Sequence, residues 1–314
     1  MQLRSKALTA VRQFFLRRGF IEVETPAVVA QPAHEPFLDP RQLLGPGWLI
    51  TSPEYHMKRL LAAGVGPCIF QICRCFRDAE RGPQHRPEFT MVEWYRAHAP
   101  YDRIATDVER LVAHTARALL GETHIDGRHG RIDLQQPWPR VTVAEAFRVF
   151  ANIDLGAASD VETFRRQALA VGCTSIDDGD DWDSTFHKLL VERVEPGLAS
   201  MGRGVHLRQY PAALAALARL SPQDATVAER FESYAGGLEL ANGFGELTDA
   251  RIQRRRFCDE RRIRQRRGRP ALPLDEAFLR DLEEMAPASG VALGLDRLIM
   301  LVTSAEQIDD VVAF

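Results

Sequence analysis

Hydrophobic and polar positions follow a helical pattern at the start of the chain. Between residues 1 and 18, apolar side chains recur at helical spacing with basic residues between them. These apolar positions are Leu3, Ala7, Val11, Phe14 and Phe15. Gly19 suits the C-terminal end of such a helix, and the residues after it predict a strand that ends at Pro26.

A second pattern, at residues 68–95, predicts an antiparallel hairpin. Residues 68–76 are largely apolar and predict a strand, residues 78–87 form a loop rich in turn formers and charge, and residues 88–95 predict the returning strand. The hairpin carries Arg77 at its lip and Phe89 on its second strand. A guanidinium can bind a phosphate and an aromatic ring can stack on a base, so this hairpin indicates a nucleotide site.

The middle of the chain is predicted to be mostly helical. Residues from about 102 to 220 show helical periodicity interrupted by Gly- and Asp-rich turns, notably at 177–181. We interpret them as a helical insertion with a structural role, after which the core resumes near Ala225. Towards the C-terminus, residues 290–298 predict a strand punctuated by glycine, which runs into an apolar helix at 298–302.

Composition sets only broad limits on function. The chain has 314 residues, of which 45% are hydrophobic, so it can bury a large core as one domain with an insertion. Its 40 basic and 43 acidic residues leave a net charge of −3, which favours a small or protein substrate over nucleic acid without excluding tRNA. The sequence has no apolar run of about 20 residues and no signal-peptide pattern, which favours a cytoplasmic location and disfavours a membrane.

Three segments resemble the signature motifs of the class II aminoacyl-tRNA synthetases. Residues 17–26 resemble motif 1, residues 76–80 with 87–95 resemble motif 2, and residues 290–298 resemble motif 3. Each segment is short, but the ordered set spans nearly the whole chain and is specific. The resemblance implies an α+β fold, with an antiparallel sheet flanked by helices, in a single catalytic domain of residues 1–314. It also implies a homodimer formed through the motif 1 region.

Within class II, the resemblance is closest to the lysyl-tRNA synthetases. It is carried by residues 51–54, 58–60 and 239–247. The chain begins with the motif 1 helix and leaves no residues for an N-terminal anticodon-binding OB-fold, so we expect the catalytic core alone. This arrangement is similar to the elongation factor P β-lysine ligases, a family of free-standing relatives that residues 52–64 match closely.

The resemblance implies an ATP site built around two arginines, which are the predicted catalytic residues. Arg77 would hold the α-phosphate and the substrate carboxylate, and Arg297 would hold the γ-phosphate. A guanidinium suits both tasks because its fixed fork binds two oxygens and stays charged. Phe89 would stack on adenine. The other residues implied at the ATP site are Asp78, Arg86, Glu239, Leu240 and Gly294.

The resemblance also implies a Mg²⁺ site next to the ATP phosphates. Glu232 and Glu239 match the carboxylates that carry the metal ion in lysyl-tRNA synthetases. We predict Glu232 on a helix that ends near Tyr234, and Glu239 on the strand that follows. Magnesium prefers oxygen ligands and keeps several waters, so two carboxylates and a triphosphate suffice.

The implied amino-acid pocket is acidic. A lysine-type substrate brings two ammonium groups, and each needs an acceptor if the pocket excludes water. Glu54 would hold the backbone-side amine, and a second group of residues would surround the side-chain amine. That group is Glu93, Tyr95 and Glu246, with Asn242 completing the polar wall and Ser52 and Ala292 bordering the pocket. Glu93 and Tyr95 share one face of their strand because they are two residues apart.

Three positions depart from the lysyl-tRNA synthetase pattern. Those enzymes have glycine where this chain has Ala292, whereas the elongation factor P ligases have alanine. One methyl group would shift the preference between α-lysine and β-lysine by about 1–3 kcal/mol, or would simply pack better in a strand. Ala79 stands in place of a glutamate and Arg86 in place of an asparagine, so contacts near the nucleotide would be remade or lost.

Residues 251–269 contain ten arginines, for which two interpretations stay open. A solvated helix face is the favoured one, since charge runs on helices usually face water. The alternative is a basic patch for RNA or for an acidic protein partner, and its place near the site would then point to the acceptor substrate.

We therefore predict an ATP-dependent, AMP-forming ligase that activates lysine, most specifically (R)-β-lysine, and transfers it to a lysine side chain of elongation factor P. Two alternatives stay open. One is a truncated lysyl-tRNA synthetase that charges tRNA, which the missing OB-fold disfavours. The other is a catalytically silent paralogue that binds amino acid or nucleotide, which only Ala79 and Arg86 favour.

Overall fold

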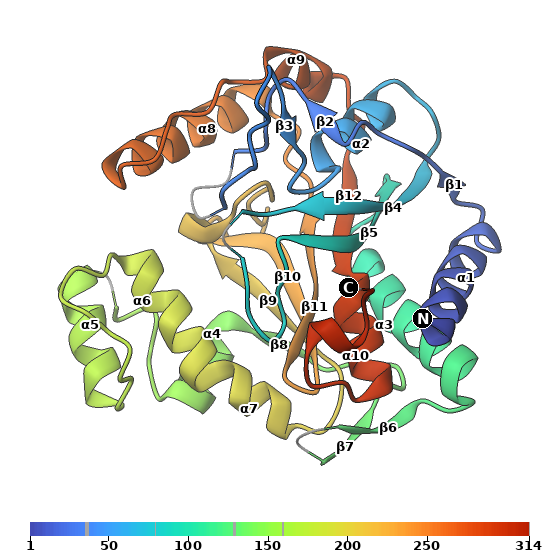
Figure 1. Ribbon diagram of the computed structural model, residues 1–314. Coiled ribbons are helices and arrows are strands. Elements are labelled where there is room, and N and C mark those ends of the chain that lie inside the picture. Colours follow the sequence, from blue (N-terminus) through green and yellow to red (C-terminus); the bar gives the residue numbers. More distant parts are fainter. Residues whose placement is uncertain (35–37, 79, 128–129, 159, 314) are drawn as a thin grey trace.

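A computed structural model describes residues 1–34, 38–78, 80–127, 130–158 and 160–313 (Figure 1). Ala79, the departure from motif 2, lies outside the described residues. Eight strands form the central sheet: β1 (Ile21–Glu22), β4 (Cys68–Phe76), β5 (Glu88–Ala97), β8 (Arg140–Thr142), β9 (Val205–Pro211), β10 (Val227–Ala235), β11 (Leu238–Gly245) and β12 (Ala288–Gly294). Two small antiparallel pairs, β2 (Val28–Val29) with β3 (Trp48–Leu49) and β6 (His124–Gly127) with β7 (Gly130–Asp133), lie outside it.

The sheet is antiparallel through its centre, as predicted. Its strand order is β1-β4-β5-β12-β11-β10-β9-β8, and only the two edge pairs, β1 with β4 and β8 with β9, are parallel. The helices are α1 (Gln2–Leu16), α2 (Glu54–Ala62), α3 (Tyr101–Leu120), α4 (Val143–Ala146), α5 (Val161–Ala170), α6 (Trp182–Leu189), α7 (Glu195–Ser200), α8 (Ala250–Arg266), α9 (Glu276–Glu283) and α10 (Leu295–Thr303). Short π or 3₁₀ turns occupy Phe147–Ala151, Leu190–Val194, Ala212–Leu214 and Ile308–Asp310.

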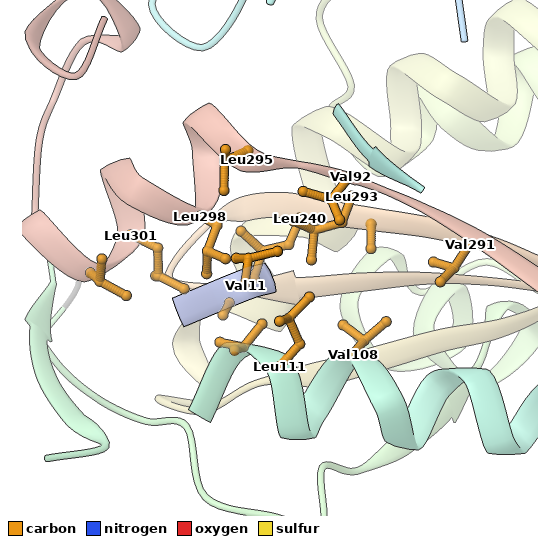
Figure 2. Close-up of a cluster of buried hydrophobic side chains, with 14 of the residues drawn as sticks. Val11, Val92, Val108, Leu111, Leu240, Val291, Leu293, Leu295, Leu298 and Leu301 are labelled. Carbon is orange, nitrogen blue, oxygen red and sulfur yellow. The ribbon is translucent and has the colours of Figure 1, made fainter. Parts of the chain in front are cut away.

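Side chains of the central strands alternate between the two faces of the sheet. Val92 and Trp94 of β5 are fully buried in a core with α1, α3 and α10. Figure 2 shows Val92 in this core. Met91, Glu93 and Tyr95 of the same strand point to the opposite face, because successive side chains of a strand alternate. One face of the sheet therefore anchors the fold, and the other is left for a site.

The structure confirms the predicted N-terminal helix and the hairpin. The helix is α1, and Gly19 after it has a φ of +74°, a left-handed conformation that glycine adopts without strain. Strands β4 and β5 pair antiparallel, with Phe76 opposite Glu88 at the loop end. The predicted C-terminal helix begins at Leu295, three residues earlier than expected.

The predicted helical insertion at about 102–220 is too long at both ends. Helix α3 packs on the central sheet and contributes Ile104, Val108 and Leu111 to the main core. Strands β8 and β9 extend that sheet. The helices α4 to α7 pack with β9 in a second apolar cluster, which contains buried Phe147, Phe186 and Leu207, and Figure 1 shows α5 and α6 to one side of the sheet. Helical periodicity reveals that a segment is a helix, but not what the helix packs against.

Among the described residues, no helix is both long and apolar enough to cross a membrane.

Candidate active site

A row of aligned residues crosses the free face of five adjacent strands. Register pairs join Gln71 of β4 to Glu93 of β5, Glu93 to Ala292 of β12, Ala292 to Asn242 of β11, and Asn242 to Glu232 of β10. Directly paired residues project to the same side of a sheet. The sheet therefore brings together side chains that lie up to 221 positions apart in sequence.

A cleft of about 890 Å³ opens over this face. Most of the predicted site residues line it: Glu54, Arg77, Arg86, Phe89, Glu239, Leu240, Asn242, Ala292, Gly294 and Arg297. Six others, all within the described residues, do not: Ser52, Asp78, Glu93, Tyr95, Glu232 and Glu246. Helices α6 and α8 supply the outer walls, through residues such as His187 and Ile263. Motif 2, motif 3 and the segment 239–247 thus converge on one cleft, although they are far apart along the chain.

Arg77 and Phe89 meet at the hairpin lip. The Arg77 guanidinium carbon is 5.1 Å from the centre of the Phe89 ring, in cation–π distance. Its other contacts are long: Nε is 3.5 Å from the carbonyl oxygen of Thr51, and Nη1 is 3.9 Å from a Glu80 oxygen. Among the described residues, most of the hydrogen-bonding capacity of Arg77 is therefore left for a ligand.

Two other predicted ATP residues differ in their surroundings. Asp78 bonds through its backbone N–H to the carbonyl of Asp39, and its half-exposed side chain lies 3.8 Å from Arg41 rather than in the cleft. Arg86 does line the cleft, and its Nη1 is 3.5 Å from Asp309 near the C-terminus. The structure thus places Arg86 in the cleft and leaves Asp78 outside its lining.

Arg297, at the start of α10, is held by the hairpin loop and by β11. Nη1 donates to the carbonyl oxygen of Glu239 at 2.8 Å and lies 3.2 Å from its carboxylate, while Nε donates to the Gln84 carbonyl at 3.3 Å. Nη2 is 2.6 Å from Nε2 of His85. Burial and then the charge of Arg297 lower the pKa of His85, so the imidazole is neutral and accepts this bond. Motif matching did not identify Gln84 and His85 as neighbours of Arg297.

A buried ion pair connects motif 1 to the other two motifs. Arg4 of α1 bonds Asp296 at 2.5 Å and Thr90 Oγ1 at 2.6 Å, and the backbone N–H of Thr90 donates to Asp296 at 2.7 Å. Asp296 precedes Arg297, and Thr90 follows Phe89. This network therefore fixes the backbone next to Arg297 and Phe89, the two residues predicted to bind the nucleotide. No local pattern in the sequence indicated these contacts.

The amino-acid end of the cleft is an acidic cluster with one buried lysine. Lys58 Nζ is 2.6 Å from both Glu54 and Glu246, and Tyr95 donates to Glu93 Oε1 at 2.6 Å. Glu93 Oε2, Glu246 Oε1 and Asn242 Oδ1 are buried and have no hydrogen-bond partner among the described residues, and Glu246 Oε2 has only the ion pair with Lys58. Gly290 leaves room for this cluster, because an added Cβ would lie 2.2 Å from the Tyr95 ring and 2.7 Å from Glu246.

Burial makes the cluster electrostatically strained without a ligand. It raises the pKa of Glu93 well above its usual range, with repulsion from Glu54 adding to the effect. It also raises the pKa of Glu246 to about 7, although Lys58 opposes this shift. Unpaired buried acids are costly, and such perturbed groups gather at functional sites. The cluster is therefore suited to receive cationic groups.

Ser52, which was predicted to border the amino-acid pocket, precedes α2 and lies outside the cleft lining.

The predicted metal ligands come from two strands of one hairpin. Glu232 lies on β10 and not on a helix, which corrects the prediction, and Glu239 lies on β11. Strand β10 is buried on both faces between β9 and β11, so its apolar and polar residues do not alternate in the usual way. Glu232 accepts hydrogen bonds from Tyr210, Tyr234 and Arg230.

The negative charge of these carboxylates is only partly neutralised by neighbouring groups. Burial raises the pKa of Glu232, but Arg230 and the two tyrosine hydroxyls outweigh it and hold that pKa below its usual value. Burial and Glu232 raise the pKa of Glu239. Glu195 of α7 adds a third acid that motif matching missed, with a pKa raised to about 7 by burial and by Glu239. Among the described residues no three His, Cys, Asp or Glu side chains form a ready-made metal site, so a cation here would need ligands from the substrate and water.

The arginines of α8 divide into a structural set and an outer stripe. Arg256 donates to the carbonyls of Ala216 and Ala218 at 2.6 Å, and buried Arg264 donates to the Leu38 carbonyl at 2.7 Å. Arg251, Arg255, Arg262 and Arg266 are exposed and fall on one side of the helix, because their spacing is close to whole turns. The favoured interpretation of a purely solvated face therefore holds for only part of this helix.

Replacement of Arg264 by methionine is expected to destabilise the protein by about 2–4 kcal/mol, because the buried guanidinium bonds the Leu38 and Pro270 carbonyls and pairs with Asp39. The matched control is Arg266→Met on the exposed face of the same helix, for which we expect a change within about 0.5 kcal/mol. Urea unfolding of both variants measures the difference. Equal stability of the two variants would show that the Arg264 contacts contribute nothing.

Comparison with known proteins agrees with the geometry of the cleft. The family model for class II tRNA synthetases (D, K and N) matches residues 1–314. The elongation factor P–(R)-β-lysine ligase of Erwinia tasmaniensis is 41% identical over 322 residues, which cover 99% of this chain and 93% of that protein. Proteins of the same name from Klebsiella pneumoniae and Pectobacterium atrosepticum are 41% and 42% identical, with the same coverage.

Proposed function

Because the chain belongs to the class II tRNA synthetase family (D, K and N), we propose that it is an ATP-dependent ligase that activates a lysine-type amino acid, with (R)-β-lysine as substrate and elongation factor P as acceptor. One observation carries the choice of amino acid. Glu54 and Glu246 both contact a single buried ammonium, Lys58, and Glu93 lies close enough to these two acids to be repelled by their charges. The ionised pocket thus has two negative charges in excess, which match the two ammonium groups of a lysine-type substrate.

In the first step, a carboxylate oxygen of the amino acid attacks the α-phosphorus of ATP. The bond to the bridging oxygen breaks, pyrophosphate leaves, and an aminoacyl adenylate forms. Both reactants are anionic, so positive charge must gather around them. Arg77 at the hairpin lip would bind the α-phosphate and the carboxylate, and Arg297 the γ-phosphate. Phe89, already beneath the Arg77 guanidinium, would stack on adenine.

In the second step, a neutral lysine amine of the acceptor attacks the carbonyl carbon of the adenylate. The bond to the AMP oxygen breaks, AMP leaves, the amine loses a proton, and an amide forms. The relatives that match 99% of this chain are named as ligases that act on elongation factor P, which supports a protein acceptor over tRNA. The outer arginine stripe of α8 stays a candidate acceptor contact. Charge reversal of Arg255 and Arg266 with unchanged acceptor affinity would remove it.

Magnesium fits the residues at the phosphate end. Glu239 lines the cleft and has a raised pKa that a nearby cation would relieve, and the charge of Glu232, whose oxygens accept from Arg230, Tyr210 and Tyr234, contributes to that shift. We propose these two residues as the protein ligands, with phosphate oxygens and waters completing the coordination. The ion would neutralise charge on the β- and γ-phosphates.

Asn242 and Ala292, which are paired on neighbouring strands, would border the amino acid. The Ala292 methyl group would affect the choice between α-lysine and β-lysine.

A homodimer through the motif 1 region is the proposed assembly. Several apolar side chains of this region are more than 40% exposed: Leu3 and Leu16 of α1, Ile21 of β1 and Val28 of β2. Exposed apolar groups on neighbouring elements mark association surfaces. Light scattering that gives the mass of one chain would contradict this assembly.

The cytoplasm is the proposed location, since ATP and a translation factor are cytoplasmic reactants.

Pyrophosphate exchange with ATP, Mg²⁺ and either α-lysine or (R)-β-lysine tests the activation step. Label transfer to elongation factor P and to lysine tRNA, followed in parallel, tests the acceptor. We expect the strongest exchange with (R)-β-lysine and label on the protein. Label on tRNA would identify a minimal tRNA synthetase, and no exchange with any amino acid would identify a silent binding paralogue.

The KM for the lysine-type substrate is expected to fall about tenfold as the pH rises from 6 to 8. The carboxyl group of Glu246 has a pKa of about 7, so it is mostly neutral at pH 6 and mostly ionised at pH 8. Only the ionised form pairs well with an ammonium group. Exchange kinetics across this range measure the effect. Glu246→Gln should remove most of the pH dependence, and an unchanged profile in that variant would contradict the assignment.

A further inference from the structure

We propose that Lys58 is a specificity-determining positioning residue, whose ammonium holds Glu54 and Glu246 as a separated pair of carboxylates so that both face a substrate with two ammonium groups. The inference rests on the proposed function and adds to it a residue that does not touch the substrate. Lys58 is only 1% exposed and is not part of the cleft lining. It therefore acts through the two acids that it bonds.

The geometry of Lys58 supports this role. Lys58 lies one turn after Glu54 on α2. Its other partner, Glu246, is the residue that directly follows β11. Nζ is 2.6 Å from one oxygen of each acid, Glu54 Oε1 and Glu246 Oε2. The second oxygen of Glu246, Oε1, has no partner among the described residues, and neither has Oε2 of Glu93. Lys58 thus uses one side of each acid and leaves unpartnered oxygens for a ligand.

The choice of lysine at this position is informative. The chain contains 37 arginines and only three lysines, Lys6, Lys58 and Lys188. An ammonium is a compact point charge with three donors, whereas a guanidinium is a wide, planar fork. The compact group suits a fully buried space between two carboxylates, because its donors can reach both acids from one point. The other cation near Glu246, Arg219, pairs with Glu229 at 2.6 Å.

Removal of the ammonium would change how the two acids behave. Two buried carboxylates without a cation repel each other and share one proton. A shared proton draws the two groups together in a mutual hydrogen bond, and both then turn away from the substrate. A substrate with two ammonium groups would lose two partners, and one with a single ammonium would lose only one. The signature of the role is therefore reduced discrimination between the two.

The test compares (R)-β-lysine with 3-aminohexanoic acid, which lacks the terminal ammonium group. We measure the KM of the first by pyrophosphate exchange and the inhibition constant of the second, at pH 8. In Lys58→Met, the KM should rise about 100-fold and the inhibition constant about tenfold, so discrimination falls about tenfold. Lys6→Met, the same substitution at an exposed position of α1, should match the wild type.

A second variant keeps the test decisive if Lys58→Met folds poorly. The double variant Lys58→Met with Glu246→Gln removes the repulsion, so it should unfold at the wild-type urea concentration and still discriminate poorly. Wild-type discrimination in either folded variant would overturn the inference, because a residue needed only for folding changes the active fraction and not this ratio. Absence of exchange in the wild type with every lysine-type substrate would instead reject the proposed function itself.

Discussion

Replacement of Arg77 by alanine is expected to slow adenylate formation about 10³-fold, with little effect on folding. The guanidinium would stabilise charge that develops on the α-phosphate, and removal of one such donor costs about 10²–10³ in rate, more where an arginine bridges both reactants. Its contacts within the protein are long, 3.5 Å to Thr51 and 3.9 Å to Glu80, so the fold does not depend on it. Pre-steady-state formation of pyrophosphate measures the rate, and urea unfolding measures the stability.

The matched control for this prediction is Arg74→Ala. Arg74 lies on β4, three residues before Arg77, and its half-exposed side chain is 3.6 Å from Glu88. We expect its rate to stay within about twofold of the wild type, since a surface ion pair contributes little. A loss of less than tenfold in Arg77→Ala would mean that the α-phosphate is bound elsewhere, and the assignment of motif 2 would need revision.

Replacement of Glu93 by glutamine is expected to weaken substrate binding and to stabilise the ligand-free fold at the same time. Glutamine keeps the shape and the bond from Tyr95 but has no charge, so the KM for (R)-β-lysine should rise by about 30-fold or more. The same change removes a buried acid whose Oε2 has no partner among the described residues. We expect a gain of about 1 kcal/mol in the free energy of unfolding at pH 8.

The pH dependence of this stability difference has a defined sign. The pKa of Glu93 is raised in the folded protein, so folding favours the protonated form. Its contribution to stability is full below the unfolded pKa near 4.5 and is lost as the pH rises through the folded pKa. The advantage of Glu93→Gln should therefore grow from pH 5 to pH 8. Glu88→Gln, an exposed change on the same strand, should show no such growth, and a parallel trend in both variants would contradict the explanation.

Local patterns in the sequence were sufficient for several elements. The predicted strand at 68–76 has the bounds of β4, and the returning strand and the N-terminal helix differ from prediction by only two residues at their ends. These elements depend on side-chain periodicity and on turn residues such as Gly19, which act over a few positions. The family resemblance then selected sixteen site residues, ten of which line the cleft, because motif residues keep their spacing.

Other features depend on contacts that local patterns do not contain. Glu232 was placed on a helix because β10, buried on both faces, lacks the alternation that marks a strand. The ends of the helical insertion were misjudged because α3, β8 and β9 owe their places to the sheet they join. The sequence thus determined which short segments are helices, strands and ligand-binding motifs. Only the tertiary structure decided that Arg4 supports Asp296 across 292 positions and that Lys58 joins Glu54 to Glu246, since charge pairs between distant segments form when packing buries both partners together.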